Sequence, residues 1–212
     1  MLPMKQLDIL GKLFGSATRV KALKFFLLNQ DGGFAVSDVA TRLRLKDAVV
    51  KKELSELAKI GFLKPKVVVL SVVGKRTTKK KKVNGFVANR EFALREPLRN
   101  LLIESGGMHV PDLAVRFTGT GKISLFVLSG VFLHDADRMI DMMIVGDRLD
   151  RKAIDTEVKK IEAEIGKELR YAVFDTEEFM YRLKMYDKLL RDTFDYPHTK
   201  IISKIDLPEL RS

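Results

Sequence analysis

The sequence of 212 residues contains no cysteine. Disulfides and thiolate metal sites are therefore excluded, and the absence is consistent with an intracellular protein. The only histidines are His109, His134 and His198, whose scattered positions do not match the spacing of metal ligands. We therefore expect no metal site and no cofactor.

Long apolar runs are also absent. No segment approaches the roughly 20 apolar residues that a membrane-spanning helix needs. The N-terminal segment Met1 to Leu10 is too short and too mixed in polarity for a secretory signal peptide. These absences predict a cytoplasmic protein without a membrane partner.

The most informative absence is that of acidic side chains between residues 57 and 90. This stretch carries ten of the chain's lysines and arginines, whereas the net charge of the whole chain is only +11. Such a local cluster gains affinity for nucleic acid by displacing the counterions of the phosphates. The alternative is a solvated loop without a ligand, because most charge runs are of that kind. The ten residues are Lys59, Lys64, Lys66, Lys75, Arg76, Lys79, Lys80, Lys81, Lys82 and Arg90.

A division at Gly106-Gly107 separates two electrically different halves. Residues 1–106 contain 22 basic and 9 acidic side chains, and residues 107–212 contain 17 basic and 19 acidic ones. Each half is long enough to bury a core of its own. We therefore predict two domains, 1–106 and 107–212, of which the first meets a polyanion.

Three short helices are predicted in the first half. Ser16 is placed to cap the first helix, which Asp31-Gly32-Gly33 ends. Ser37 is placed to cap the second. The third runs from about Lys46 to Ile60, and its inward side chains are Val50, Leu54 and Leu57.

Two strand-like segments follow the third helix. They are Val67 to Val73 and Val83 to Ala88, and the lysine-rich segment Gly74 to Lys82 is expected to form the loop between them. Three helices followed by such a hairpin indicate a helix-turn-helix with a wing, whose third helix is the recognition helix. The wing residues expected to contact DNA are Lys75, Arg76, Lys79, Lys80, Lys81 and Lys82.

The recognition helix is expected to turn a second set of polar residues outward. Lysine near the start of such a helix can read guanine, can contact phosphate, or can remain in water. No arginine, asparagine or glutamine lies on this face, so strong base specificity is not expected. The predicted contacts of this helix are Lys46, Lys51, Lys52 and Ser55, beside Asp47 and Val49.

The first half resembles the ArsR-like winged-helix transcriptional regulators. The matching segments are Leu13 through Leu28, Val36 to Ala40 and Val50 through Leu63, and the segment from Asn89 to Leu102 is similar to that group's closing helix. The resemblance covers nearly all of residues 10–104 and implies that 1–106 is a winged-helix DNA-binding domain. The cysteine and histidine ligands of metal-sensing members have no counterpart here, so metal sensing is not implied.

The segment Phe92 to Ile103 places four leucines on one helical stripe. The stripe either closes the core of the first domain or forms the contact of a homodimer. Its members are Leu94, Leu98, Leu101 and Leu102.

The second half is predicted to alternate strands and helices around a small mixed sheet. Strands are expected at Leu125 to Leu128, Asp141 to Asp147 and Glu168 to Phe174. Helices are expected at Arg151 to Ile165 and from Thr176 onward. This order resembles the minimal nucleotidyltransferase domain over about Val115 to Ile202. The sequence segments on which the resemblance rests are Ile144-Val145-Gly146-Asp147, Ile165-Gly166-Lys167-Glu168 and Thr176-Glu177-Glu178-Phe179.

The catalytic motifs of that family are degraded in this chain. Active members use a Gly-Ser turn and an Asp-x-Asp pair that holds Mg²⁺. The turn here reads Ser129-Gly130, in the reverse order, and Met139 replaces the first carboxylate of the pair while Asp141 matches the second. A thioether does not ligate Mg²⁺, so we expect no catalytic and no metal residue. The alternatives are a site rescued by Asp135 and Asp137, and an Asp141 that is only a surface or turn-facing carboxylate.

These patterns predict an α+β protein with an N-terminal winged helix-turn-helix domain followed by a small mixed-sheet nucleotidyltransferase-like domain. The expected function is that of a DNA-binding transcriptional regulator, not an enzyme, with double-stranded DNA as its partner. The inactive second domain would serve assembly or ligand sensing. The alternatives are a nucleotidyltransferase tethered to nucleic acid and an RNA-binding or antitoxin-like interaction module.

Overall fold

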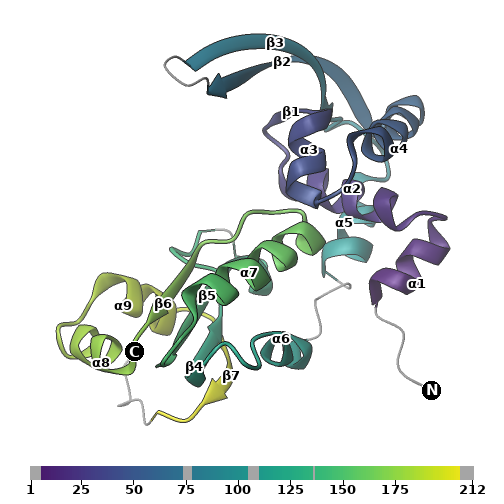
Figure 1. The fold of residues 1–212 in the computed structure, drawn as a ribbon. Helices are drawn as coiled ribbons and strands as arrows, with labels where there is room; N and C mark the ends of the chain where they lie inside the picture. The colour runs from purple at the N-terminus through teal and green to yellow at the C-terminus, as the bar shows by residue number, and fades with distance from the viewer. Residues whose placement is uncertain (1–5, 74–77, 105–109, 136, 206–212) are drawn as a thin grey trace. The chain divides into compact units, whose positions relative to one another are not determined.

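The computed structural model describes residues 6–73, 78–104, 110–135 and 137–205. The chain forms two compact units. The first comprises Met1–Gly106 together with Ile161–Lys167, and the second comprises Gly107–Lys160 and Glu168–Ser212. Helices and two small sheets make the fold α+β, as predicted (Figure 1).

The first unit begins with four helices. Helix α2 starts after Ser16, whose side-chain oxygen accepts a hydrogen bond from the Arg19 N–H at 3.1 Å, so the predicted cap is confirmed. Gly61 follows the last of the four with φ +83°, the left-handed conformation that glycine adopts without strain. The helices are α1 (Gln6–Leu13), α2 (Ala17–Leu28), α3 (Val36–Leu43) and α4 (Asp47–Lys59).

The predicted cap of α3 is wrong. Ser37 lies inside the first turn of the helix, and Ala35 occupies the capping position. The Asp38 carboxylate reaches back and accepts a hydrogen bond from the Ala35 N–H at 3.2 Å. A carboxylate one turn into a helix satisfies the free backbone N–H at its start and also suits the positive end of the helix dipole.

A three-stranded antiparallel sheet completes the first unit. Its strands are β1 (Gly33–Ala35), β2 (Leu63–Val73) and β3 (Thr78–Ala88), in the order β1-β3-β2. The two predicted strands are confirmed but longer, and β1 was not predicted because Gly32-Gly33 indicated only a helix stop. The prediction that Lys79 to Lys82 belong to a loop is wrong: they are part of β3, paired with the valine-rich β2 from Val72 to Val69. Exposed lysines are tolerated in a strand whose opposite partners favour β structure.

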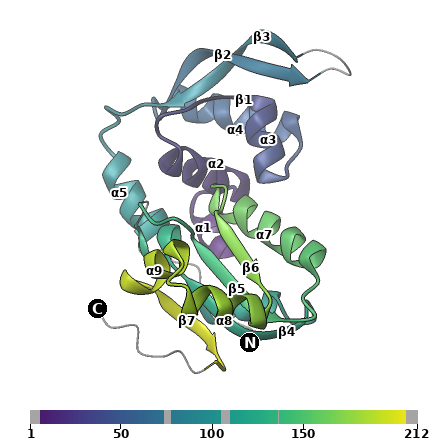
Figure 2. The same cartoon turned by 90° about the vertical axis from the view of Figure 1, so that its left-hand side faces the viewer.

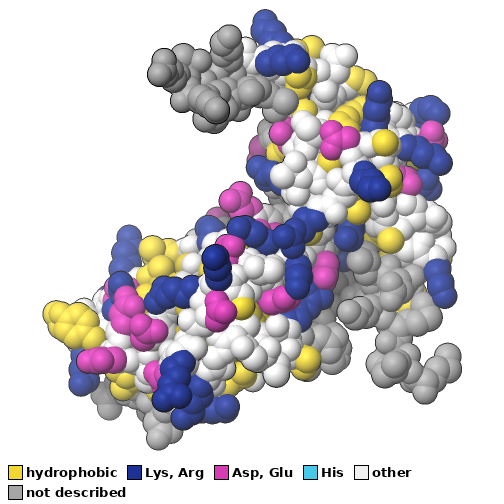
Figure 3. Space-filling model, in the orientation of Figure 1, with side chains coloured by type: hydrophobic (Ala, Val, Ile, Leu, Met, Phe, Trp, Pro, Cys, Tyr) yellow, Lys and Arg dark blue, Asp and Glu magenta, His cyan; other side chains and the backbone are white. Residues whose placement is uncertain are grey.

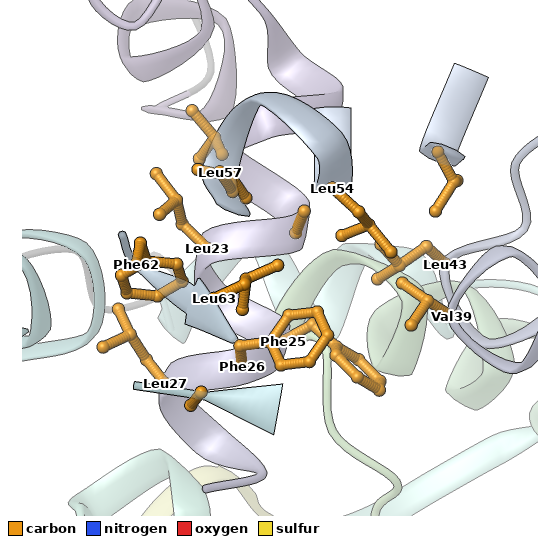
Figure 4. Close-up of a cluster of buried hydrophobic side chains, with 14 of the residues drawn as sticks. Leu23, Phe25, Phe26, Leu27, Val39, Leu43, Leu54, Leu57, Phe62 and Leu63 are labelled. Carbon is orange, nitrogen blue, oxygen red and sulfur yellow. The ribbon is translucent and has the colours of Figure 1, made fainter. Parts of the chain in front are cut away.

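The core of the first unit lies between its helices and its sheet (Figure 4). Phe25, Phe26 and Phe34 meet edge to face, with ring centroids 4.8 to 5.9 Å apart. Edge-to-face geometry brings the positive edge of one ring to the negative face of another. Helix α4 contributes the predicted inward side chains Val50, Leu54 and Leu57, each at most 1% exposed.

The predicted closing helix is a shorter α-helix, α5 (Arg95–Arg99), continued by a π-helical turn, Asn100–Glu104. Its leucine stripe is divided. Leu102 is fully buried and Leu98 packs against the core, whereas Leu94 and Leu101 are 58% and 42% exposed. The stripe therefore closes the core with only two of its members.

The second unit contains the mixed sheet that was predicted, in the order β6-β5-β4-β7. Strands β5 and β6 are parallel and the other pairs are antiparallel. A parallel pair requires a crossover connection, and helix α7 provides it. The strands are β4 (Lys122–Leu128), β5 (Met142–Asp147), β6 (Tyr171–Phe174) and β7 (Thr199–Ser203).

Helices α8 and α9 cover one face of this sheet (Figure 2). Phe179, Leu183 and Leu190 of these helices pack in one cluster with Leu125 and Val145 of the strands. The bounds predicted for α7 are confirmed, and so is the start of α8. The helices are α6 (Val110–Arg116), α7 (Arg151–Ile165), α8 (Thr176–Lys184) and α9 (Lys188–Asp195), and a 3-10 turn, Gly130–Leu133, follows β4.

Candidate nucleic-acid interface

Helix α4 presents a basic face to solvent. Its buried side is formed by Val50, Glu53, Leu54 and Leu57, so with about 100° between successive residues the opposite side carries Lys52 and Ser55. Lys46, Lys51 and Lys52 are exposed as predicted, whereas Ser55, also predicted to point outward, is half-buried. Ala48, which was not predicted to be part of this face, lies exposed in the same row as Lys52 and Ser55, and its small side chain leaves room for close approach to a partner.

An ion pair fixes this helix on α2. The Glu53 side chain is only 10% exposed, and the Arg19 guanidinium donates to it at 2.9 Å. Arg19 also donates to the backbone oxygen of Phe14 at 3.2 Å. The pair was not predicted, although an isolated glutamate on the otherwise apolar side of α4 was a signal for it. It holds the basic face of α4 in a defined orientation within the unit.

The hairpin of β2 and β3 carries the second group of cations. Lys80, Lys81 and Lys82 are all exposed, and basic side chains are visible on the described part of the hairpin (Figure 3). Lys75 and Arg76 lie outside the described residues, and the side chain of Lys79 is not described either. Of the six predicted wing contacts, the structure therefore locates the side chains of three.

Some cations of the acid-free stretch are paired with acids outside it. Lys59 contacts Glu56 and Lys64 contacts Glu91, both at 2.8 Å, and Arg90 contacts Asp31. The hydrogen bonds from these lysines lower the pKa of Glu56 and of Glu91 below the ordinary value of a glutamate. Within the part of the chain that the structure describes, Lys80, Lys81 and Lys82 have no acidic partner. These three lysines therefore remain available to a partner, as do Lys51 and Lys52 of α4.

In the second unit, Asp141 is buried, with 1% of its surface exposed. Its Oδ1 accepts from the Val131 N–H at 2.9 Å, and its Oδ2 accepts from the Arg170 N–H at 2.8 Å. The Arg170 guanidinium lies 3.4 Å from each oxygen. Gly130 adopts φ +53°, and a Cβ at that position would collide with the Asp141 carboxylate. The turn after β4 is therefore folded around this carboxylate.

These residues do not fit a Mg²⁺ ion. Both oxygens of Asp141 are engaged by N–H donors, and Met139 offers a thioether. Asp135 contacts the Arg138 side chain at 2.9 Å, and Asp137 lies exposed at the turn. Among the described residues, no group of three or more His, Cys, Asp or Glu side chains could hold a metal ion. The N–H groups that donate to Asp141 indicate that this carboxylate stabilises the fold.

Arg138 ties the same loop to helix α9. Its guanidinium lies 3.7 Å from the ring centroid of Tyr196, and Asp192 lies 3.6 Å away on α9. Asp192 also accepts from the Met139 N–H at 2.8 Å. The acids and bases of this region thus compensate one another, and acidic and basic side chains intermingle on the visible face of the second unit (Figure 3).

Comparisons with protein-family models, with curated proteins and with solved structures found no match. No helix in the described ranges is long and apolar enough to cross a membrane.

Proposed function

We propose that this chain is a DNA-binding transcriptional regulator whose first unit is a winged-helix domain. The element order supports the proposal: after α2 come β1, α3, α4, β2 and β3, which is three helices with a hairpin after the third. In such a domain the third helix enters the major groove and the hairpin lies beside it. The observation that carries the proposal is the exposed basic face of α4 together with the acid-free lysine hairpin in the same unit.

The lysines divide into two groups with different expected roles. Lys46, Lys51 and Lys52 on α4 would lie at the groove, where lysine contacts phosphate or guanine. The hairpin lysines would contact phosphates and add affinity without sequence preference.

In this proposal the second unit does not catalyse nucleotide transfer. Nucleotide transfer in the fold that it resembles needs carboxylates free to hold a metal ion, and the hydrogen bonds to Asp141 use both of its oxygens. The unit would therefore serve assembly or ligand sensing. The exposed Leu94 and Leu101 of the first unit offer an apolar surface for a homodimer.

The proposal is tested by measuring binding to a labelled DNA duplex and to single-stranded RNA of the same sequence. We expect the duplex to bind more tightly, and Lys51→Ala/Lys52→Ala to weaken duplex binding about tenfold through the loss of two phosphate contacts. Lys59→Ala is the matched control, because that lysine is on the same helix but is paired with Glu56. Tighter binding of the RNA would favour the RNA-binding alternative.

The absence of nucleotide transfer needs its own assay. The protein is incubated with each labelled nucleoside triphosphate, Mg²⁺ or Mn²⁺, and nucleic-acid or protein acceptors. We expect no label on any acceptor. Metal-dependent transfer would contradict the proposal that the second unit is inactive.

A further inference from the structure

The register of the hairpin separates three consecutive lysines that the sequence alone does not distinguish. Val69 lies opposite Lys82, and Val67 lies opposite Asn84. Directly opposite residues of an antiparallel pair share a face, and so do residues two apart on one strand. One face, which we call the valine face, therefore consists of Val67, Val69, Lys80, Lys82 and Asn84, whereas Lys81 projects from the opposite face with Val68.

The valine face continues the side of the sheet that covers the core. Nearer the helices, the same side carries Leu63 and Ala88, which are 1% and 8% exposed. Strand β1 ends at Ala35, opposite Gly85, so the hairpin beyond that point is a two-stranded ribbon that extends past α3 (Figure 1). There Val67 and Val69 are 61% and 55% exposed.

Near its base, the opposite face is packed within the three-stranded sheet. Val68 is only 8% exposed and lies over Gly33 and Gly85. A Cβ on either glycine would lie 2.8 or 2.9 Å from the Val68 methyl groups, which is too close. The two faces therefore differ: on the opposite face Val68 is buried and its partner Val83 is half-buried, whereas the valine face presents two exposed valines beside lysines of the neighbouring strand.

A partner for the valine face must combine negative charge with apolar surface. A duplex offers both, because phosphates line the edges of each groove while sugar carbons and thymine methyl groups line its walls and floor. A two-stranded ribbon fits the major groove, and Lys80 and Lys82 lie about 6.8 Å apart along the strand. On each DNA strand one phosphate occurs for every ~3.4 Å of helix axis, so both lysines can reach phosphates of one strand.

Single strands and acidic proteins fit this face less well. Single-stranded nucleic acid is held by aromatic side chains on which bases stack, and the valine face contains none. An acidic protein surface would satisfy the lysines, but consecutive exposed lysines that have no acidic partner among the described residues match a continuous polyanion better.

We propose that the valine face is the side of the hairpin that meets duplex DNA, with Val67 and Val69 against the groove and Lys80 and Lys82 on phosphates. Lys81 makes no phosphate contact in this arrangement. The inference rests on the proposed DNA-binding function and adds which residues of the hairpin carry it.

The test measures fluorescence anisotropy of a labelled random-sequence duplex over a salt series. Lys80→Ala/Lys82→Ala lowers affinity about tenfold and reduces the slope of log affinity against log salt by about 1.8, since each phosphate contact contributes about 0.9. Lys81→Ala, which removes the same charge one residue away, leaves the slope unchanged. Val67→Thr/Val69→Thr keeps β-branching, lowers affinity roughly fivefold and also leaves the slope unchanged.

The possible outcomes distinguish a failure of the face assignment from a failure of the proposed DNA binding. Equal effects of Lys81→Ala and of the single Lys80→Ala and Lys82→Ala variants would overturn the assignment of a face, while DNA binding itself would stand. Tighter binding of the corresponding single strand would overturn the choice of a duplex. A wild-type protein that does not bind the duplex at low salt would refute the underlying function. Thermal melting of each variant confirms that the fold is retained.

Discussion

The hairpin of the first unit and the Asp141 turn of the second unit use charge in opposite ways. On the hairpin, Lys80, Lys81 and Lys82 are exposed and have no described acidic partner. At the turn, one carboxylate is fully buried and surrounded by N–H donors. Charges that are satisfied within the protein hold the fold, and charges that remain available in solvent are those that can bind a partner. The difference supports a structural role for Asp141 and is the basis for the proposed binding role of the hairpin.

The largest expected effect is that of removing the buried carboxylate. Asp141→Ala leaves the partly buried Val131 and Arg170 N–H groups without their buried acceptor. We expect a loss of about 2 kcal/mol in the free energy of unfolding, because two N–H donors and the Arg170 guanidinium lose a charged acceptor. Urea denaturation measures the change.

Asp137→Ala is the control for that experiment, because Asp137 is exposed in the same loop. We expect it to change stability by less than about 0.5 kcal/mol. Equal stabilities of the two variants would contradict the structural role of Asp141.

A smaller effect is expected from the ion pair that orients α4. Glu53→Ala leaves the half-exposed Arg19 without its partner, and solvent screening limits the cost to about 1 kcal/mol. Because α4 also loses its fixed orientation, duplex affinity should fall with stability. Glu56→Ala removes an exposed acid from the same helix and provides the control. Unchanged duplex binding in Glu53→Ala would show that the pair does not position the helix.

Self-association tests whether the remaining exposed leucines of the first unit have a partner. Leu94 and Leu101 are 58% and 42% exposed, whereas Leu98 and Leu102 pack into the core. We expect a homodimer that Leu94→Lys/Leu101→Lys converts to a monomer, as measured by light scattering. If the wild-type protein is a monomer at high concentration, the leucine stripe does not form a dimer contact.

The smallest effect concerns the exposed pair of Glu91 and Lys64. The hydrogen bond from Lys64 lowers the pKa of Glu91 in the folded state. The stabilisation is therefore present above the ordinary pKa of a glutamate and is lost as pH falls through the lowered folded value. Glu91→Gln should therefore lower the melting temperature slightly at neutral pH, leave it unchanged in strong acid, and so flatten its dependence on acidic pH. A clear loss of stability at neutral pH would show that the pair contributes more than an exposed ion pair normally does.

Local patterns in the sequence predicted most of the regular elements. The helices with apolar residues at helical spacing, α4 and α7, were placed within one residue of their ends, because a buried stripe and a terminal glycine are local signals. Short elements stabilised from a distance were missed. Strand β1 has three residues and exists through its pairing with β3, and β7 exists through its pairing with β4.

The candidate site was predicted by residue type but not by geometry. Composition identified the lysine run, yet the boundary between loop and strand and the division of the lysines between two faces depend on the register with β2. The burial of Asp141 was likewise hidden, because its partners Val131 and Arg170 lie 10 and 29 residues away in the chain. Hydrogen bonds between residues far apart in the chain cannot be predicted from the periodicity of the sequence.

The salt dependence of duplex binding by the unmodified protein tests the central claim most directly. If the α4 lysines and the valine-face lysines together make about five phosphate contacts, log affinity falls with log salt at a slope near −4.5. That slope would show that the available charge of the first unit meets a polyanion. An affinity that does not change with salt, or no binding at low salt, would contradict the claim and leave the lysines as a solvated surface.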